Sequence, residues 1–163
     1  MLLEEHGDEL QLLDHLDANN PHCAVLTQGA PVFFQLLGPD AYASPDLYPD
    51  PQLPGWLYLS VQGDARVESV LNEAALRDLL EASTRPLGAA NQDFTLEPTD
   101  AHIDRFIGGV HSFRLQVTRI SGVAKLAKDK GRRDAQLAHE YLSERTSPDG
   151  KTLLERLMSA TPM

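Results

Sequence analysis

Residues 38–49 read GPDAYASPDLYP, and this stretch decides how the middle of the chain is interpreted. It directly follows the apolar run 32–37, VFFQLL, whose length and composition favour a buried strand. Because proline fixes φ and lacks a backbone donor, the five prolines in residues 39–54 predict a long, stiff loop. Apolar and polar side chains then alternate over 56–62, WLYLSVQ, as in a half-buried strand. The stretch is therefore a stiff aromatic connection between two strands, which either holds a ligand or only turns a corner.

The rest of the pattern predicts an α+β chain that is mainly antiparallel β. Further strands are expected at 2–4, 9–16, 113–117 and 123–126, with a bulge or turn at 63–64 and a turn at 121–122. Helices are expected after the N-caps Asn72, Thr99 and Ser147, and over 132–144. Because strands and helices do not alternate along the chain, the pattern excludes a parallel doubly wound sheet. An antiparallel barrel or sheet with peripheral and C-terminal helices fits best.

Composition narrows the classes of function. The 163 residues suit a single domain, and the net charge of −10 argues against direct nucleic-acid binding, which needs a basic footprint. Basic residues cluster at 125–133, and this run either meets a phosphate or is the solvated start of a helix. No apolar run approaches the roughly 20 residues of a membrane span. We expect a cytoplasmic protein, because Cys23 is the only cysteine and forms no intrachain disulfide.

Motifs that carry chemistry are not found. His15, His22 and Cys23 have no standard zinc-binding spacing, so no metal site is expected. The sequence also lacks a phosphate-binding glycine loop, a Gly-x-Ser-x-Gly elbow and a His-Glu-x-x-His helix. No catalytic acid, base or nucleophile stands out, and whether the protein is an enzyme stays open.

A resemblance to a known family adds what these patterns do not give. The stretches GPDAYASPDLY and LPGWLYLSVQGDARV resemble the Gly-Pro-x-Ala-Tyr-x-Ser-Pro-x-x-Tyr and Pro-x-Trp-x-Tyr segments of the FMN-binding negative transcriptional regulator family, of the PaiB type. Residues 15–22, HLDANNPH, are similar to its His-Leu-x-x-x-Asn-Pro element. Residues 106–134 are similar to its Arg-Ile-x-Gly-x-x-Lys-Leu segment. The resemblance covers residues 2–135 in the family's order.

The resemblance implies a flavin-binding split β-barrel that forms a homodimer, with FMN at the subunit interface. It places a split-barrel domain with inserted helices at 1–127 and a C-terminal helical extension at 128–163. Its implied role is regulatory or redox-linked. The residues it marks for contact with FMN are His15, Asn20, Tyr42, Ser44, Tyr48, Trp56, Tyr58, Lys125 and Lys128. Several also have a plain structural interpretation: packing of Trp56 and Tyr58, a local turn hydrogen bond of Ser44, or a strand position of His15.

Two departures from the family pattern leave an alternative open. The family's first strands have no counterpart here, so an incomplete barrel is expected, with edges that must be covered or shared. Polar residues of the family are replaced by Ala18, Leu57 and Ala127. The rival hypothesis is therefore a degenerate split barrel that serves as a dimerisation or interaction module and no longer binds flavin. A small oxidoreductase on the same fold is a third possibility.

Overall fold

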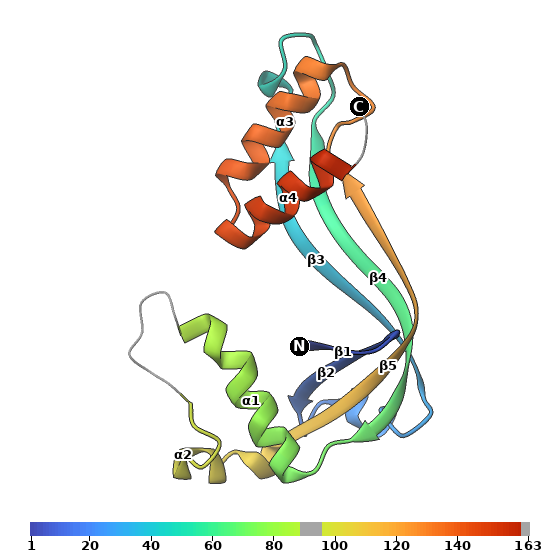
Figure 1. Cartoon of the computed structure of the whole chain (residues 1–163), viewed down its shortest axis with the longest axis vertical. Helices are drawn as coiled ribbons and strands as arrows, with labels where there is room; N and C mark the ends of the chain where they lie inside the picture. Colours follow the sequence, from blue (N-terminus) through green and yellow to red (C-terminus); the bar gives the residue numbers. More distant parts are fainter. Residues whose placement is uncertain (89–95, 161–163) are drawn as a thin grey trace. The chain divides into compact units, whose positions relative to one another are not determined.

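The computed structural model of the chain describes residues 1–88 and 96–160. In this part of the chain the strands are β1 (Leu2–His6), β2 (Glu9–Asp17), β3 (Pro31–Ala43), β4 (Gly55–Val70) and β5 (Val110–Lys125) (Figure 1). The helices are α1 (Glu73–Gly88), α2 (Ala101–Asp104), α3 (Arg132–Glu144) and α4 (Pro148–Ala160), with 3-10 turns η1 (Pro21–Ala24), η2 (Pro45–Leu47) and η3 (Ile107–Gly109). The strands form an antiparallel sheet in the order β1-β2-β5-β4-β3, which does not close into a barrel within the described residues. The predicted α+β class is confirmed.

The opening stretch is partly strand, not loop as predicted. β3 continues through Gly38 and Pro39 to Ala43, so irregular chain begins only at Ser44. The sheet order explains this, because β3 is an edge strand, where a proline without an N–H group costs no ladder hydrogen bond. Gly38 is tightly packed, since a Cβ there would lie 3.3 Å from the Cβ of Leu59.

No turn forms at 63–64, where a bulge or turn is predicted, or at 121–122, where a turn is predicted. β4 and β5 run through these positions as single strands of 16 residues each. Gly63 is present because of close packing, not because of a turn: a Cβ there would lie 2.2 Å from the carbonyl oxygen of Arg119 and 2.7 Å from Cζ of Phe34. An isolated glycine inside a strand pattern signals either a turn or such a close approach, and the sequence alone did not separate the two.

The helix predictions hold with one exception. Asn72 caps α1 through its Oδ1, which accepts a hydrogen bond from the Ala75 amide at 3.0 Å. Ser147 caps α4, its Oγ accepting from the Gly150 amide at 3.2 Å, and α3 covers the predicted range 132–144. Thr99 does not begin a helix, because α2 starts at Ala101 and is a single turn. Of the residues expected on the apolar side of a longer helix, Ile103 is buried but Phe106 is 69% exposed, and the chain enters the 3-10 turn η3 at Ile107.

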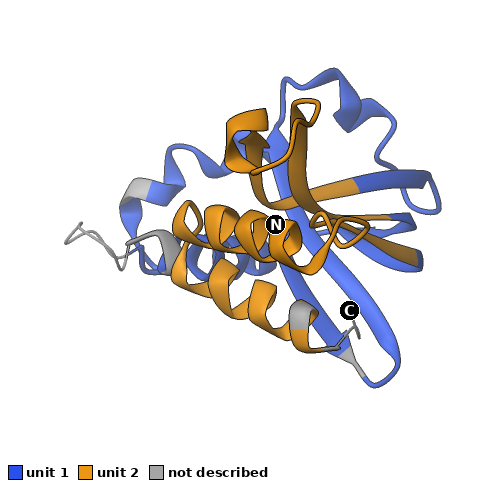
Figure 2. Cartoon of the chain, turned by 90° about the horizontal axis from the view of Figure 1, so that it is seen from above, with its two compact units in different colours: residues 1–34, 63–119 blue, residues 35–62, 120–163 orange. Residues whose placement is uncertain are grey.

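The chain divides into two compact units (Figure 2). Unit 1 comprises residues 1–34 and 63–119, and unit 2 comprises residues 35–62 and 120–163. In unit 1, β1 and β2 form an antiparallel pair, β2 pairs with β5 from Gln11↔Gln116 to Asp17↔Val110, and α1 contacts β1. Three consecutive residues of β2, from Gln11 to Leu13, are buried, so both faces of this strand are covered.

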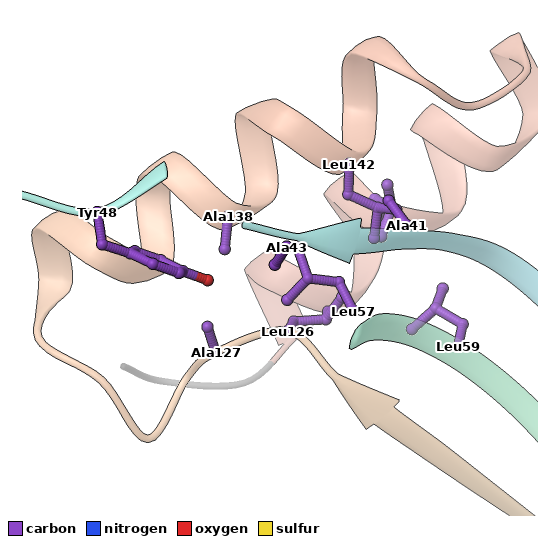
Figure 3. Packing of buried hydrophobic residues seen from close by; sticks show 10 residues of the cluster. Ala41, Ala43, Tyr48, Leu57, Leu59, Leu126, Ala127, Ala138 and Leu142 are labelled. Atoms are coloured by element: carbon purple, nitrogen blue, oxygen red, sulfur yellow. The ribbon is translucent and has the colours of Figure 1, made fainter. Parts of the chain in front are cut away.

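Unit 2 has its own apolar core, formed between the end portions of its strands and the pair α3–α4 (Figure 3). The cluster contains Ala41, Ala43, Tyr48, Leu57, Leu59, Leu126, Ala127, Ala138, Leu142 and Leu154. Leu142 of α3 and Leu154 of α4 are completely buried. Among the described residues, no helix is both long and apolar enough to cross a membrane.

Candidate functional site

A pocket of about 80 Å³ opens in unit 2 where three strands end. Ala43 is the last residue of β3, Gly55 the first of β4 and Lys125 the last of β5, and all three line it. The complete lining is Ala43, Tyr48, Leu53, Gly55, Trp56, Leu57, Lys125, Ala127, Asp129 and Lys130. The pocket therefore combines an apolar and aromatic wall with three charged side chains.

Tyr48 is the aromatic residue at the buried side of the pocket. Its side chain is only 8% exposed and packs in the unit 2 core, with Ala127 and Ala138 near its hydroxyl end (Figure 3). The ammonium of Lys130 lies 4.4 Å from the centroid of the ring, a cation–π contact. Burial raises the pKa of the Tyr48 hydroxyl, and the carboxylates of Asp134 and Asp129 raise it further. The hydroxyl is therefore a neutral donor at physiological pH.

The chain between β5 and α3 adds Ala127, Asp129 and Lys130 to the lining of the pocket. Ala127 is buried and has a φ of 56°, in the left-handed region that residues other than glycine seldom adopt. Its carbonyl oxygen accepts a hydrogen bond from the Lys130 amide at 3.0 Å, which closes a turn. The proline-rich loop, which adds Leu53 to the lining, is tied to α3, because Nε2 of Gln52 donates to Oδ2 of Asp134 at 2.5 Å. Both walls of the pocket are thus held by specific contacts.

Trp56 brings a second, partly exposed aromatic group to the site. Its ring is 48% exposed, and its Nε1 donates to Oδ2 of Asp40 at 2.8 Å. Tyr42 lies beside it, with ring centroids 6.1 Å apart and planes tilted by 58°. The hydrogen bond fixes the indole while leaving about half of it open to a ligand.

The structure brings some of the sequence-predicted residues together in unit 2. Tyr48, Trp56 and Lys125 line the pocket, and Tyr42 contacts Trp56. Tyr58 is half-buried on β4 and does not line the pocket.

Two other predicted residues in unit 2 have structural partners instead. Ser44 caps η2: its Oγ accepts from the Asp46 amide at 3.3 Å and donates to Oδ2 of Asp46 at 3.2 Å. The ammonium of Lys128 donates to the carbonyl oxygen of Leu157 at 3.0 Å, close to the C-terminal end of α4. Neither residue is part of the pocket lining.

His15 and Asn20 belong to unit 1. Asn20 caps η1, its Oδ1 accepting from the His22 amide at 3.0 Å. His15 on β2 is directly opposite Ser112 on β5, and its Nδ1 and the Ser112 Oγ are both buried without a hydrogen-bond partner in the described part of the chain. Buried polar atoms normally find partners, so this pair is a second place of chemical interest.

Sequence reasoning missed Asp129 and Lys130. Both lie in the basic run 125–133, which was interpreted either as a phosphate contact or as a solvated helix start. The contact of Lys130 with Tyr48 joins residues 82 positions apart, a distance that no local pattern spans. Of the replaced polar positions, Leu57 and Ala127 are buried in the core, whereas Ala18 is exposed in unit 1.

Comparisons with known proteins give the family and the fold of the chain. A family described as "Putative FMN-binding domain" matches residues 1–119. No curated protein shows significant similarity to the chain. A solved structure, the "FAD and Heme binding protein from Mycobacterium smegmatis", is 18% identical with a TM-score of 0.50. The match covers 82% of this chain and 62% of that protein, and at this identity it shows a shared fold.

Proposed function

The chain belongs to the FMN-binding domain family, and from that premise we propose that the pocket of unit 2 binds flavin mononucleotide. The observation that carries the proposal is the pocket itself, which gathers an indole, a phenol and two ammonium groups at the ends of three strands. Trp56 offers a partly open aromatic face for a flat ring system, while Lys125 and Lys130 offer cations for a phosphate.

The polar and apolar groups of the pocket match the phosphate and the ring of FMN. A phosphate dianion is costly to hold against protein unless cations or hydroxyl donors compensate it, and the pocket provides both in its lysines and in the neutral Tyr48 hydroxyl. The apolar wall of Ala43, Leu53 and Leu57 suits the hydrocarbon edge of the ring. When bound, the flavin supplies the redox chemistry, and the residues of the chain bind it, orient it and exclude water.

The pocket of one chain is too small to enclose FMN, so the flavin proposal requires a second wall. Its volume of about 80 Å³ is well below the roughly 300–1,000 Å³ of pockets that enclose cofactors. Unit 2 would then provide one wall of the site and a second copy of the chain the other, as the resemblance to the PaiB-type family implies. The half-exposed Tyr42 and Trp56 are suited to such a shared surface.

By the same resemblance, we propose a regulatory or redox-linked role in the cytoplasm, of the negative transcriptional regulator type. The net charge of −10 favours regulation without direct contact to DNA by this chain. The rival is an interaction module without flavin, which the small pocket and the buried Leu57 favour.

Visible absorbance and thermal unfolding distinguish the flavin-binding protein from the interaction module. We expect purified protein to show visible flavin absorbance, or to gain thermal stability with added FMN, because a ligand selective for the folded state stabilises it. At 100 times the Kd the gain is about 2.7 kcal/mol, which is readily measured as a shift in Tm. A colourless protein whose Tm ignores saturating FMN, at protein concentrations where it is dimeric, would reject flavin binding in favour of the interaction module.

A further inference from the structure

The positions of Lys125 and Lys130 suggest how the pocket selects its ligand. The turn at Ala127, closed by the hydrogen bond from the Lys130 amide to the Ala127 carbonyl, folds the chain back after β5. As a result both lysines line the same pocket although five positions separate them. The intervening Lys128 instead donates to the carbonyl of Leu157. Of the three neighbouring lysines, two therefore line the pocket and the third contacts α4.

The two pocket lysines have no competing ion pair. Within the described residues neither lies within ion-pair distance of a carboxylate, and the Lys130 ammonium rests on the Tyr48 ring. A cation–π contact holds the ammonium in place while leaving its N–H groups free to donate. Tyr48 itself is buried and fixed in the core, so this end of the pocket is preorganised.

The local charge is opposite in sign to that of the whole chain. The chain carries −10, whereas the pocket lining has two ammonium groups against the single carboxylate of Asp129. The Tyr48 hydroxyl adds no charge, because its pKa is raised. The positive charge of the pocket therefore contrasts with the negative net charge of the chain, and it favours binding of an anionic group.

We propose that Lys130, together with Lys125, binds the terminal phosphate of the flavin and so makes the pocket select FMN over riboflavin. The inference rests on the proposed function, since it assigns one end of that ligand to one end of that pocket. Lys130 is then a specificity-determining residue, and Asp129 opposes it by repelling the same phosphate.

Binding of FMN and riboflavin to the full chain tests the proposal, with flavin fluorescence and Tm shift as readouts. Wild-type protein should bind FMN more tightly than riboflavin. In K130Q, FMN binding should weaken about tenfold, the size of one lost charge-assisted hydrogen bond, while riboflavin binding changes less than about twofold. D129N should tighten FMN binding a few-fold at low salt, and both effects should shrink in about 0.5 M salt because screening weakens charge interactions.

Arg133 provides a matched control. It belongs to the same basic run and is exposed, but it does not line the pocket, so R133Q should leave the FMN preference unchanged. If both flavins bind wild-type protein equally, or if K130Q and R133Q have the same effect, the assignment of Lys130 is wrong although flavin binding stands. If neither flavin binds wild-type protein, the proposed function itself fails.

Discussion

The two units of this chain differ in the kind of side-chain atoms that they bury. Unit 2 buries an almost purely apolar cluster, and three charged side chains line its pocket. Unit 1 buries more polar atoms without a hydrogen-bond partner: within the described residues these are His15 Nδ1, His111 Nε2, Ser112 Oγ and Arg114 Nε, against His139 Nε2 alone in unit 2. Buried apolar surface stabilises a fold, whereas unpaired buried polar atoms cost free energy and persist where they serve something else. The comparison shows that the candidate pocket and most of the unpaired buried polar atoms lie in different units of the chain.

The largest effect should come from the core of unit 2. Leu154 is completely buried, so L154A should lower the free energy of unfolding by about 2–5 kcal/mol through lost burial and the cavity left behind. Leu153, its neighbour on α4, is 43% exposed and is the matched control, since L153A should cost well under half as much. Urea unfolding measures both. Equal losses would mean that the cluster is not the core of unit 2.

The next largest loss of stability should come from adding a side chain at the closely packed Gly63 of unit 1. A Cβ at Gly63 would meet the Arg119 carbonyl oxygen at 2.2 Å, and backbone cannot yield cheaply, so G63A should cost about 1–3 kcal/mol. Gly122 is the control in unit 2, because its nearest neighbour, the Ser60 carbonyl oxygen, would be 3.8 Å away. Thermal unfolding of G63A and G122A gives the comparison, and a G63A protein as stable as G122A would contradict the close approach.

Ionisation of Tyr48 should make unit 2 less stable at alkaline pH. Its pKa is raised in the folded state, chiefly by burial, so above its ordinary value of 10 the unfolded chain releases the proton first. The contribution of this group to the free energy of unfolding is therefore fully present below pH 10. It falls as the pH rises beyond 10, by at most about 1.4 kcal/mol per pH unit. Y48F removes this proton, so its urea midpoint between pH 9 and 11 should fall less steeply than that of wild-type protein. Parallel slopes would show that Tyr48 is not desolvated.

The smallest expected change is also the most diagnostic for unit 1. Ser112 is 2% exposed and its Oγ has no partner, so S112A should leave stability unchanged or raise it, because no hydrogen bond is lost. S60A, at a serine of unit 2 that is 6% exposed, allows for the general effect of serine-to-alanine changes in a buried strand. If S112A alone is destabilising by more than about 1 kcal/mol, the hydroxyl has a partner in solution, and the contrast between the units weakens.

The sequence predicted the elements well where periodicity and caps agree, as at Asn72 and Ser147, because such signals depend on neighbouring residues. It failed at Gly63 and Pro39, where the same residue types serve turns, edge strands or close packing, and only the sheet order decides.

The pocket could be predicted only in part. The resemblance marked Tyr48, Trp56 and Lys125, which the structure brings together. It did not mark Lys130, whose place depends on the turn at Ala127 and on contact with a distant tyrosine. The matched family covers residues 1–119, so the wall formed by residues 125–130 lies beyond the part that the family describes.

Fluorescence of Trp56 during a titration with FMN tests the central claim most directly. Trp56 is the only tryptophan of the chain and lines the pocket, so a flavin bound in this pocket must quench its emission. We predict saturable quenching with the same Kd as the Tm shift, weakened in K130Q, after correction with free N-acetyltryptophanamide for absorption by the flavin. If FMN stabilises the protein while Trp56 emission shows no saturable change, the flavin binds elsewhere and the pocket of unit 2 is not its site.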